Sequence, residues 1–205
     1  MRNYIELCKI FPYPVVTSRY VITKTTFNKS DLDIIKKSWH PKRFEKYGNT
    51  FVEGKDYVVL FDKSTNQTMM SSHEFEMITN QKFLDNAKGD VLIFGLGIGL
   101  IVYPLLKDEN INSITIVEVD KDLISEIFPL LAEFDYLNRL EVKHSDAFKF
   151  ETDKKFDTIY FDIWASIGEE AFNEMDILSN MFRKNLKEEG WMDSWCSEEI
   201  NYELK

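Results

Sequence analysis

The chain has 205 residues, of which 44% are apolar and 14% aromatic, and its formal net charge is −10. This length allows one substantial hydrophobic core with an appendage and is too short for two full-sized domains. No stretch reaches the roughly 18 uncharged apolar residues of a membrane helix, and charges and prolines interrupt the N-terminus before a signal-peptide core forms. The sequence therefore predicts a cytoplasmic protein with no membrane partner.

Charge is distributed unevenly along the chain. Residues 1–50 carry ten Lys and Arg against four Asp and Glu, whereas residues 51–205 carry fifteen against thirty-one. An acidic body disfavours nucleic acid as a partner and suits a small-molecule substrate that is neutral or cationic. The basic leader interleaves aromatic residues in KKSWHPKRFEKYGN, and it either docks on the acidic body, lies solvated or contacts a polyanion. Cys8 and Cys196 lie outside metal-ligand spacing, so we expect two reduced thiols and no metal site.

The first 88 residues divide into two expected parts. Residues 1–56 form a basic extension in which SDLDIIKKSW predicts one short helix, capped by Ser30 and halted by Pro41. Residues 57–88 form a β-hairpin around a polar turn and then a lead-in helix. The segment HEFEMITNQKFLDNAKG predicts that one face of this helix carries Phe75, Ile78, Phe83 and Leu84.

From residue 89 to residue 205 the pattern changes to alternating strands and helices. The expected strands are VLIFG, SITIVEVD, LEVKHSD, FDTIYFDIW and GWMDSWC. The expected helices are IGLIVYPLLKD, KDLISEIFPLLAEF and EEAFNEMDILSNMFRKNL. This pattern predicts an α/β fold with a doubly wound, Rossmann-like, mostly parallel sheet. Few residues follow the last strand, so either the sheet is C-terminally truncated or its edge is covered by the N-terminal region or by a second subunit of a homodimer.

The segment GDVLIFGLGIGL places three glycines at alternate positions behind an apolar strand. Gly95, Gly97 and Gly99 allow a sharp turn at a helix N-terminus and leave no Cβ between the main chain and a ligand. Glu118 ends the next strand, close to the spacing of about 20 residues at which a carboxylate accepts hydrogen bonds from ribose hydroxyls. The glycine spacing suits a nucleoside carrying an amino acid better than a dinucleotide. A turn used only for tight packing is the alternative.

Two further carboxylates follow expected strands. Asp146, in HSDAF, is placed to accept from an exocyclic adenine amine or to cap a turn. Asp162, in YFDIW, projects beyond the carboxyl edge of the sheet, where it can hold an ammonium or act as a base. Trp164 either walls the substrate pocket, offering a ring face to a cation, or packs against the long helix.

Several other side chains carry weaker signals. His40, His73 and His144 have no spacing for a metal or a catalytic triad, so we expect them to be solvated or hydrogen-bonded, although His73 stands close enough in sequence to reach the mouth of the pocket. The pair Met69-Met70 is expected in core or lid packing.

Taken in order, GDVLIFGLGIGL, TIVEVDKDLI, HSDAF and FDTIYFDIW resemble the motifs of class I S-adenosylmethionine-dependent methyltransferases. Within that superfamily the chain is most similar to the spermidine synthase-like branch of polyamine aminopropyltransferases, and its ending resembles small proteins of this kind from phage and bacterial genomes. The resemblance implies that the amino-acid part of the cofactor is surrounded by Gly95, Leu96, Gly97 and Gly99. It also implies that Glu118 and Val119 bind the ribose, and Asp146 and Ala147 the adenine. We expect Asp162 both to contact the cofactor and to act in catalysis, with Trp164.

The chain departs from the patterns of both groups. Methyltransferases often carry an acidic residue where this chain has Ile93, and aminopropyltransferases usually carry acidic residues where it has Ile98 and Ala165. The segment DIWA also differs from the signature of base methylation on nucleic acids. The first hypothesis is therefore a methyltransferase that uses S-adenosylmethionine on a small molecule or protein. The alternatives are an aminopropyltransferase that uses decarboxylated S-adenosylmethionine, and a binding protein without turnover.

Overall fold

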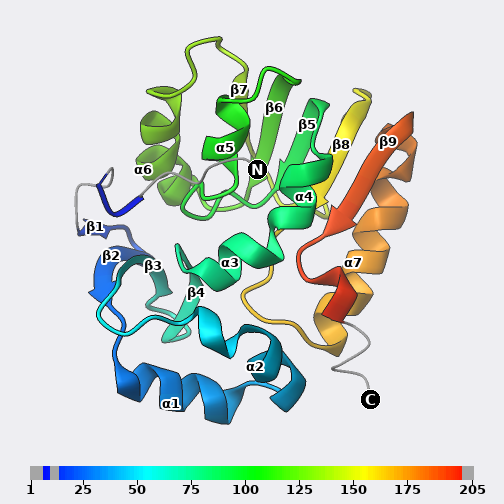
Figure 1. Ribbon diagram of the computed structural model, residues 1–205. Coiled ribbons are helices and arrows are strands. Elements are labelled where there is room, and N and C mark those ends of the chain that lie inside the picture. Colours follow the sequence, from blue (N-terminus) through cyan, green and yellow to red (C-terminus); the bar gives the residue numbers. More distant parts are fainter. Residues whose placement is uncertain (1–6, 10–13, 200–205) are drawn as a thin grey trace.

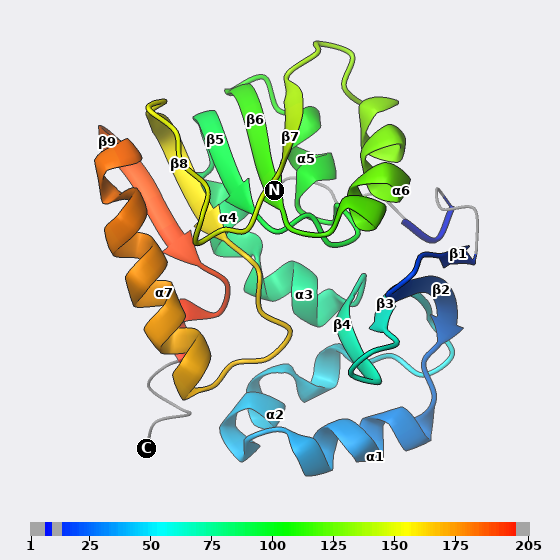
Figure 2. The ribbon, with the colours of Figure 1, turned by 180° about the vertical axis from the view of Figure 1, so that it is seen from behind.

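Two sheets organise the chain. The computed structural model describes residues 7–9 and 14–199, in which a four-stranded antiparallel sheet precedes a five-stranded parallel sheet (Figure 1). In Figures 1 and 2, the carboxyl ends of the parallel strands point toward the smaller sheet. Across the described ranges, no helix is long and apolar enough to cross a membrane.

The parallel sheet has the strand order β7-β6-β5-β8-β9, and every neighbouring pair is parallel. Its strands are β5 (Gly89–Phe94), β6 (Ile111–Glu118), β7 (Leu140–His144), β8 (Phe156–Phe161) and β9 (Leu186–Ser194). The order reverses direction on either side of β5, the first of these strands in the chain. This topology confirms the predicted Rossmann-like fold, and it is the reversal point at which open α/β sheets bind ligands.

Helices cover both faces of this sheet. Val91 and Ile93 of β5 pack in a core with α5 (Val102–Leu106) and α6 (Lys121–Ala132). Leu92 and Phe94 point the other way, into a second core with α7 (Glu169–Phe182), which runs alongside β9 (Figure 2). The strand is apolar at each of these four positions because both of its faces are buried.

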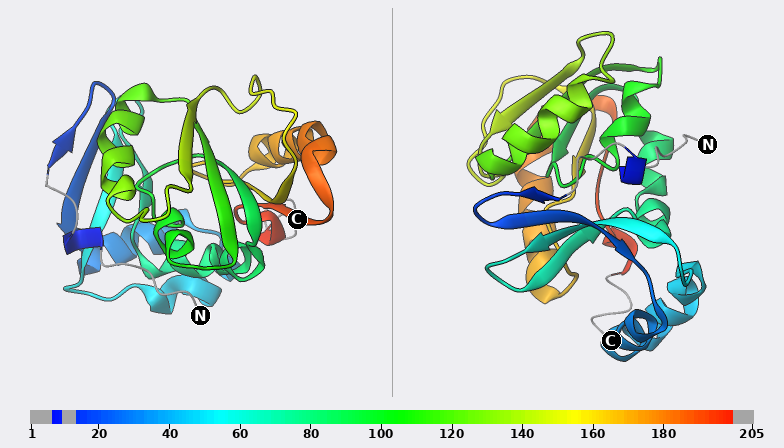
Figure 3. Two further views of the ribbon diagram at one scale, coloured as in Figure 1. Left: turned by 90° about the horizontal axis from the view of Figure 1, so that it is seen from above. Right: turned by 90° about the vertical axis from the view of Figure 1, so that its left-hand side faces the viewer.

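The antiparallel sheet is larger than the predicted hairpin. Its order is β1-β2-β3-β4, with the strands β1 (Val15–Val16), β2 (Tyr20–Thr26), β3 (Asp56–Asp62) and β4 (Gln67–Ser71). The hairpin of β3 and β4 is confirmed, and β2 from the basic leader pairs with β3 along its full length. Figure 3 shows this sheet lying across the ends of the parallel strands. Part of the leader is therefore built into the fold.

The first helix differs from the prediction at its cap. It spans α1 (Lys29–Ser38), and its cap is Asn28 instead of Ser30. The side-chain oxygen of Asn28 accepts hydrogen bonds from the amides of Ser30 and Asp31, so Ser30 already lies in the first turn. Pro41 begins the next helix, α2 (Pro41–Tyr47), as proline does at first helical positions.

The predicted lead-in helix is two short helices, α3 (Glu74–Thr79) and α4 (Gln81–Asn86). They meet at Asn80, which is 1% exposed and accepts a hydrogen bond of 2.8 Å from the hydroxyl of Tyr160. The break turns Ile78 outward, to 48% exposure, so the single apolar face that includes Ile78 is wrong.

The helix predicted over IGLIVYPLLKD is also shorter. It covers only the residues of α5, because Gly97 and Gly99 have positive φ and hold the preceding residues in turns. Single 3₁₀ turns complete the described structure, at Leu7–Lys9, Gly48–Thr50, Arg183–Asn185 and Ser197–Glu199.

Candidate functional site

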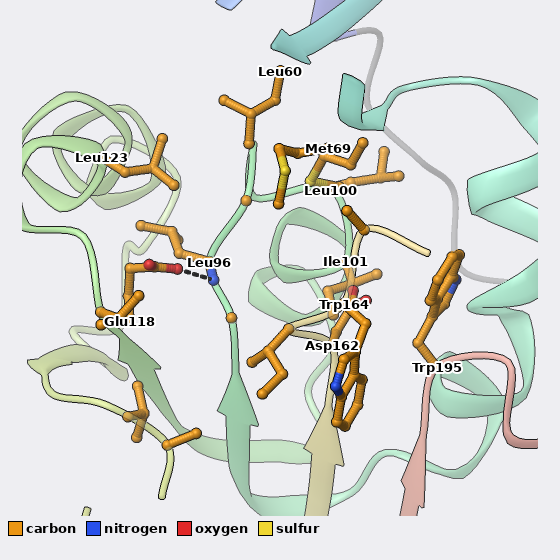
Figure 4. Close-up of a pocket in the computed structure, with 18 of the residues that line it drawn as sticks. Leu60, Met69, Leu96, Leu100, Ile101, Glu118, Leu123, Asp162, Trp164 and Trp195 are labelled. Atoms are coloured by element: carbon orange, nitrogen blue, oxygen red, sulfur yellow. Dashed lines mark hydrogen bonds between the residues drawn. The ribbon is translucent and has the colours of Figure 1, made fainter. Parts of the chain in front are cut away.

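A cavity of about 340 Å³ lies where β5, β6 and β8 end, and we call it the loop cavity. The parallel strands supply its floor, and Leu60 and Met69 reach it from the antiparallel sheet (Figure 4). Nine of the ten site residues predicted from the sequence line this cavity, and Gly99 is the exception. The nine are Gly95, Leu96, Gly97, Glu118, Val119, Asp146, Ala147, Asp162 and Trp164.

 Eight of these nine are predicted cofactor-binding positions, and Trp164 is the predicted wall of the pocket. The fold thus gathers residues that are far apart in the sequence.

The glycine loop is approached closely by the protein's own atoms. Gly95, Gly97 and Gly99 have φ of 97°, 50° and 72°, a region that favours glycine. A Cβ at Gly95 would collide with the backbone oxygen of Asp162, and one at Gly97 with Sδ of Met70. A Cβ at Gly99 would lie 2.8 Å from the side chain of Leu131, outside the cavity. Packing against backbone therefore requires glycine at Gly95, whereas at Gly97 and Gly99 the colliding atoms are side chains and the positive φ is the stronger reason for glycine.

The amides of this loop already have acceptors. Leu96 donates its N–H to Oε2 of Glu118 at 2.8 Å (Figure 4), and Gly99 donates to the carbonyl of Leu96 at 2.9 Å. Ile98 donates to Sδ of Met70 at 3.3 Å. Met70, expected in core or lid packing, thus lies directly on the glycine loop. Few loop amides remain for a bound anion.

Glu118 fixes the loop from the end of β6. Its side chain is 8% exposed, and Oε1 accepts a second hydrogen bond, of 2.9 Å, from the amide of Asp120. Burial raises the pKa of Glu118, while the hydrogen bonds from the backbone oppose that shift. The backbone hydrogen bonds, which come from Leu96, Val119 and Asp120, leave the carboxylate with remaining acceptor capacity, so the same group can order the loop and accept from a ligand hydroxyl.

Asp146 and Ala147 line the cavity beyond β7. Asp146 accepts the amide hydrogen of Phe148 at 2.9 Å, which is the turn-capping arrangement weighed from the sequence. This hydrogen bond, with a smaller contribution from Lys149 at 3.3 Å, lowers the pKa of Asp146. The carboxylate therefore stays ionised and available as an acceptor while it caps the turn.

Asp162 lies immediately after β8, at the centre of the cavity (Figure 4). Its amide donates to the carbonyl of Phe94 at 2.8 Å, which continues the sheet by one residue and fixes the carboxylate at the strand end. Burial raises the pKa of Asp162 to about 7. The group is thus poised to exchange a proton near neutral pH.

Trp164 contacts the long helix and also lines the loop cavity. Its Nε1 donates to Glu174 of α7 at 2.6 Å, and its ring lines the loop cavity. The hydrogen bond holds the ring against the helix that covers the sheet.

Glu76 is a carboxylate of this cavity that the sequence did not predict. It lies in α3 and lines the cavity with Asp162. Burial raises its pKa to about 8, the charge of Asp162 adds to the shift, and Arg43 opposes it. The only signal in the sequence was an acidic helix shortly before the glycine loop, because the proximity of α3 to β8 depends on the tertiary fold.

A second cavity, of about 760 Å³, adjoins the first, and we call it the aromatic cavity. It is bounded by β2, β3 and β4 and by residues of α1 and α2, which Figures 1 and 2 show beyond the antiparallel sheet. The two cavities share the lining residues Met69, Met70, Glu76, Ala165 and Trp195. They therefore meet around the edge strand β4.

The three histidines all make hydrogen bonds, as predicted. Nδ1 of His40 accepts from Lys42 and Nδ1 of His73 from Phe75, so each caps a helix, and Nε2 of His144 lies 3.0 Å from the carbonyl of Val119. His73 also lines the aromatic cavity. Within the part of the chain that the structure describes, no group of three His, Cys, Asp or Glu residues is arranged to hold a metal ion.

The parallel sheet, with the glycine loop after its first strand, has the Rossmann-like strand order expected from the resemblance to class I S-adenosylmethionine-dependent methyltransferases. The chain belongs to the spermine/spermidine synthase domain family, whose model matches residues 71–205. Proteins of both groups are transferases.

Solved structures similar to this chain include a DhpI complex with SAH, a putative methyltransferase from Thermoplasma acidophilum and the glycopeptide N-methyltransferase MtfA complexed with (S)-adenosyl-L-homocysteine. Their identities to this chain are 19%, 21% and 22%, and the TM-scores are 0.45, 0.41 and 0.44. The matches cover 59%, 51% and 57% of this chain, and 56%, 42% and 46% of the respective solved chains. The chain thus spans about half the length of these structures. A comparison with curated proteins finds no match.

Proposed function

We propose that the protein transfers the aminopropyl group of decarboxylated S-adenosylmethionine to a small-molecule amine. The observation that carries this proposal is the charge of the loop cavity. Among the described residues, its lining includes four carboxylates, on Glu76, Glu118, Asp146 and Asp162, and neither Lys nor Arg. Such a lining favours a ligand with positive charge and no carboxylate of its own.

The state of the glycine loop supports the decarboxylated form over S-adenosylmethionine. The carboxylate of S-adenosylmethionine needs a cationic side chain or unused amides. The amide of Leu96 is bonded to Glu118 and that of Ile98 to Met70. Decarboxylated S-adenosylmethionine keeps the sulfonium and the ammonium but lacks this carboxylate, so both of its charged groups match the acidic lining.

The proposed roles follow the order of the strands. Glu118 accepts from the ribose hydroxyls with its remaining lone pairs, with Val119 beside it, and Asp146 with Ala147 receives the adenine. Gly95, Leu96 and Gly97 bound the aminopropyl side. Gly99 supports the loop through its contact with Leu131 and touches no ligand.

The reaction needs a base beside the attacking amine. When bound, the nucleoside supplies a sulfonium-activated carbon, to which the amine nitrogen bonds as the C–S bond breaks onto sulfur and neutral methylthioadenosine leaves. Asp162 receives the proton that the nitrogen loses, because its pKa of about 7 lies near the working pH. Glu76 supplies the second carboxylate near the amine, because this chain has Ala165 at the position where aminopropyltransferases usually carry an acidic residue.

Methyl transfer from S-adenosylmethionine is the second candidate. Ile98 and Ala165, which stand where aminopropyltransferases usually carry acidic residues, favour it. In this case Asp162 orients or deprotonates the acceptor, and Trp164 walls the site. The third alternative, nucleoside binding without turnover, predicts that Glu118→Ala loses the ligand and keeps cellular activity.

Ligand-dependent thermal stability separates these candidates. A ligand that binds the native state stabilises it by about 2.7 kcal/mol at 100 times its Kd. We expect decarboxylated S-adenosylmethionine and methylthioadenosine to raise the midpoint more than S-adenosylmethionine and S-adenosylhomocysteine at equal concentration. The reverse order would favour methyl transfer, and no shift with any of the four would contradict both enzymes.

A further inference from the structure

The aromatic cavity is the space next to the proposed reaction centre. Glu76 lines both cavities, and Met69 and Met70 of β4 lie at the junction. An amine that attacks a carbon held beside Asp162 can therefore have its body in the aromatic cavity. The chemistry of that cavity selects the acceptor.

Aromatic side chains dominate its walls. One face of the antiparallel sheet packs in the core through Ile22, Val58 and Leu60, whereas the alternate positions of β2 and β3 line the cavity. Around them lie Phe27, Trp39, Phe51, Tyr57, Phe61 and Phe75. Trp39 and Phe75 have ring centroids 4.6 Å apart, and those of Phe27 and Phe51 are 5.2 Å apart. Such a wall stabilises an apolar or aryl group by burial and ring contacts.

Few charges line this cavity. Among the described lining residues, the carboxylates are Asp31 and Glu76, and the one arginine is Arg43. Asp31 is committed to the cap of α1, where its carboxylate accepts the amide hydrogen of Asn28 at 2.9 Å. Burial lowers the pKa of His73 to about 4, so this histidine is neutral at pH 7.

Arg43 makes the part of the aromatic cavity next to Glu76 positively charged. Its guanidinium lies over the rings of Trp39 and Phe75, 4.6 and 4.8 Å from their centroids. Its positive charge reaches Glu76, where it opposes the rise in pKa. Asp162 can match one ammonium, with Glu76 beside it, while a second ammonium on a longer acceptor would approach the positive charge of Arg43.

We propose that the acceptor is a primary monoamine with an aryl or bulky apolar body, and not a linear polyamine. This inference rests on the proposed function for its chemistry. The amine nitrogen forms the new C–N bond to the aminopropyl carbon, the C–S electron pair leaves with methylthioadenosine, and one proton passes to a carboxylate. The product is the N-aminopropyl derivative of the monoamine.

The test compares amines on the full chain by turnover and by binding. Phenethylamine, tryptamine, putrescine and spermidine are each supplied with decarboxylated S-adenosylmethionine, and release of methylthioadenosine is measured together with product mass. Binding of the same amines is measured calorimetrically with methylthioadenosine or S-adenosylhomocysteine present. We expect the two aryl amines to exceed putrescine and spermidine by about tenfold or more in both readouts.

The readouts separate failure of the inference from failure of the proposed function. Equal or better binding of putrescine or spermidine overturns the monoamine inference, as does absence of binding by all four amines. If aryl amines bind preferentially but no methylthioadenosine is released, aminopropyl transfer fails and the assignment of the cavity stands.

A matched pair of substitutions on α1 tests whether the acceptor binds in the aromatic cavity. Ile35 lines the aromatic cavity, whereas its neighbour Ile34 is 63% exposed and lies outside it. Ile35→Glu places a carboxylate in the cavity, and we expect the preference for phenethylamine over putrescine to fall about tenfold. Ile34→Glu adds the same charge outside and leaves the preference unchanged. An equal effect of the two substitutions would contradict binding of the acceptor in the aromatic cavity.

Discussion

The charge of Asp162 raises the pKa of Glu76, although the two residues come from α3 and from the end of β8. Burial is the larger cause at Glu76 and the cause at Asp162, whose pKa is about 7 against about 8 for Glu76. Asp162 loses its proton first, beside a neutral Glu76. Glu76 then titrates in the field of a negative charge, so the two carboxylates titrate in sequence.

This order predicts unequal effects of removing each group. Asp162→Asn should lower the pKa of Glu76, because one of the causes that raise it disappears. Glu76→Gln should leave the pKa of Asp162 nearly unchanged, since Glu76 is neutral while Asp162 titrates. Carboxyl ¹³C NMR titration of the two variants measures both values. Equal shifts in the two variants would contradict sequential titration.

Raised carboxyl pKa values also make stability depend on pH. Asp162 has an ordinary value of 3.8 and a folded value of about 7, and Glu76 has 4.5 and about 8. The stabilising effect of holding these protons is complete below pH 4 and is lost as the pH rises through 7 and 8. Between pH 5 and 8 the unfolding free energy should fall more in the native chain than in Asp162→Asn, by about 1 kcal/mol or more.

Urea unfolding at several pH values gives this difference. The comparison between variants cancels His73, whose lowered pKa makes stability rise with pH over part of the range. Asp33→Asn, at an exposed position of α1, removes a carboxylate without changing the cavity and serves as the control. A pH profile of Asp162→Asn that matches the native chain would contradict the raised pKa of Asp162.

Substitutions at Gly97 and Gly54 distinguish the free-energy cost of backbone strain from the cost of a steric collision. Both have positive φ, 50° and 82°, but a Cβ at Gly54 meets nothing within 4 Å. Gly54→Ala should lower the unfolding free energy only through backbone strain, by about 1 kcal/mol. Gly97→Ala adds the collision with Met70, so it should lower the unfolding free energy by more than Gly54→Ala does. In a Met70→Ala background, the loss at Gly97 should return toward the Gly54 value, as measured by denaturant unfolding of the four variants.

The hydrogen bond from Tyr160 to Asn80 predicts a stability loss on removal of one hydroxyl. Tyr160→Phe leaves the buried side-chain oxygen of Asn80 without this donor, and the expected loss is about 1–3 kcal/mol. Tyr136→Phe is the control, because Tyr136 is 85% exposed. Similar unfolding midpoints for both variants in urea would mean that the α3–α4 junction does not depend on this bond.

Local patterns in the sequence predicted the parallel sheet and the positions at its strand ends. Asp162 directly follows an apolar strand, and Asp146 comes two residues after the end of β7, so the strand pattern places both at the edge where the cavity lies. The partnership of β2 with β3 was not predictable in this way, because the seven residues of β2 include three threonines and a lysine and pair across a gap of about 30 residues.

The parts of the site contributed by tertiary packing were missed for the same reason. Glu76 lies in a helix whose sequence pattern is that of an ordinary amphipathic segment. Its proximity to Asp162 depends on how α3 packs at the carboxyl ends of the parallel strands. The glycines were interpreted as space for a ligand, whereas Asp162 and Met70 occupy the positions that their Cβ atoms would take. Spacing indicates close approach but does not identify the atoms that approach.

The central position of β5 has a consequence for synthesis of the chain. One edge of β5 pairs with β6, which follows soon after, but the other edge pairs with β8, which is made about 70 residues later. At ribosomal rates of 5–20 residues per second, that edge waits about 4–14 s for its partner. During this interval an apolar strand is open to pairing with other chains, so nascent chains that stall before β8 are the ones most exposed to aggregation.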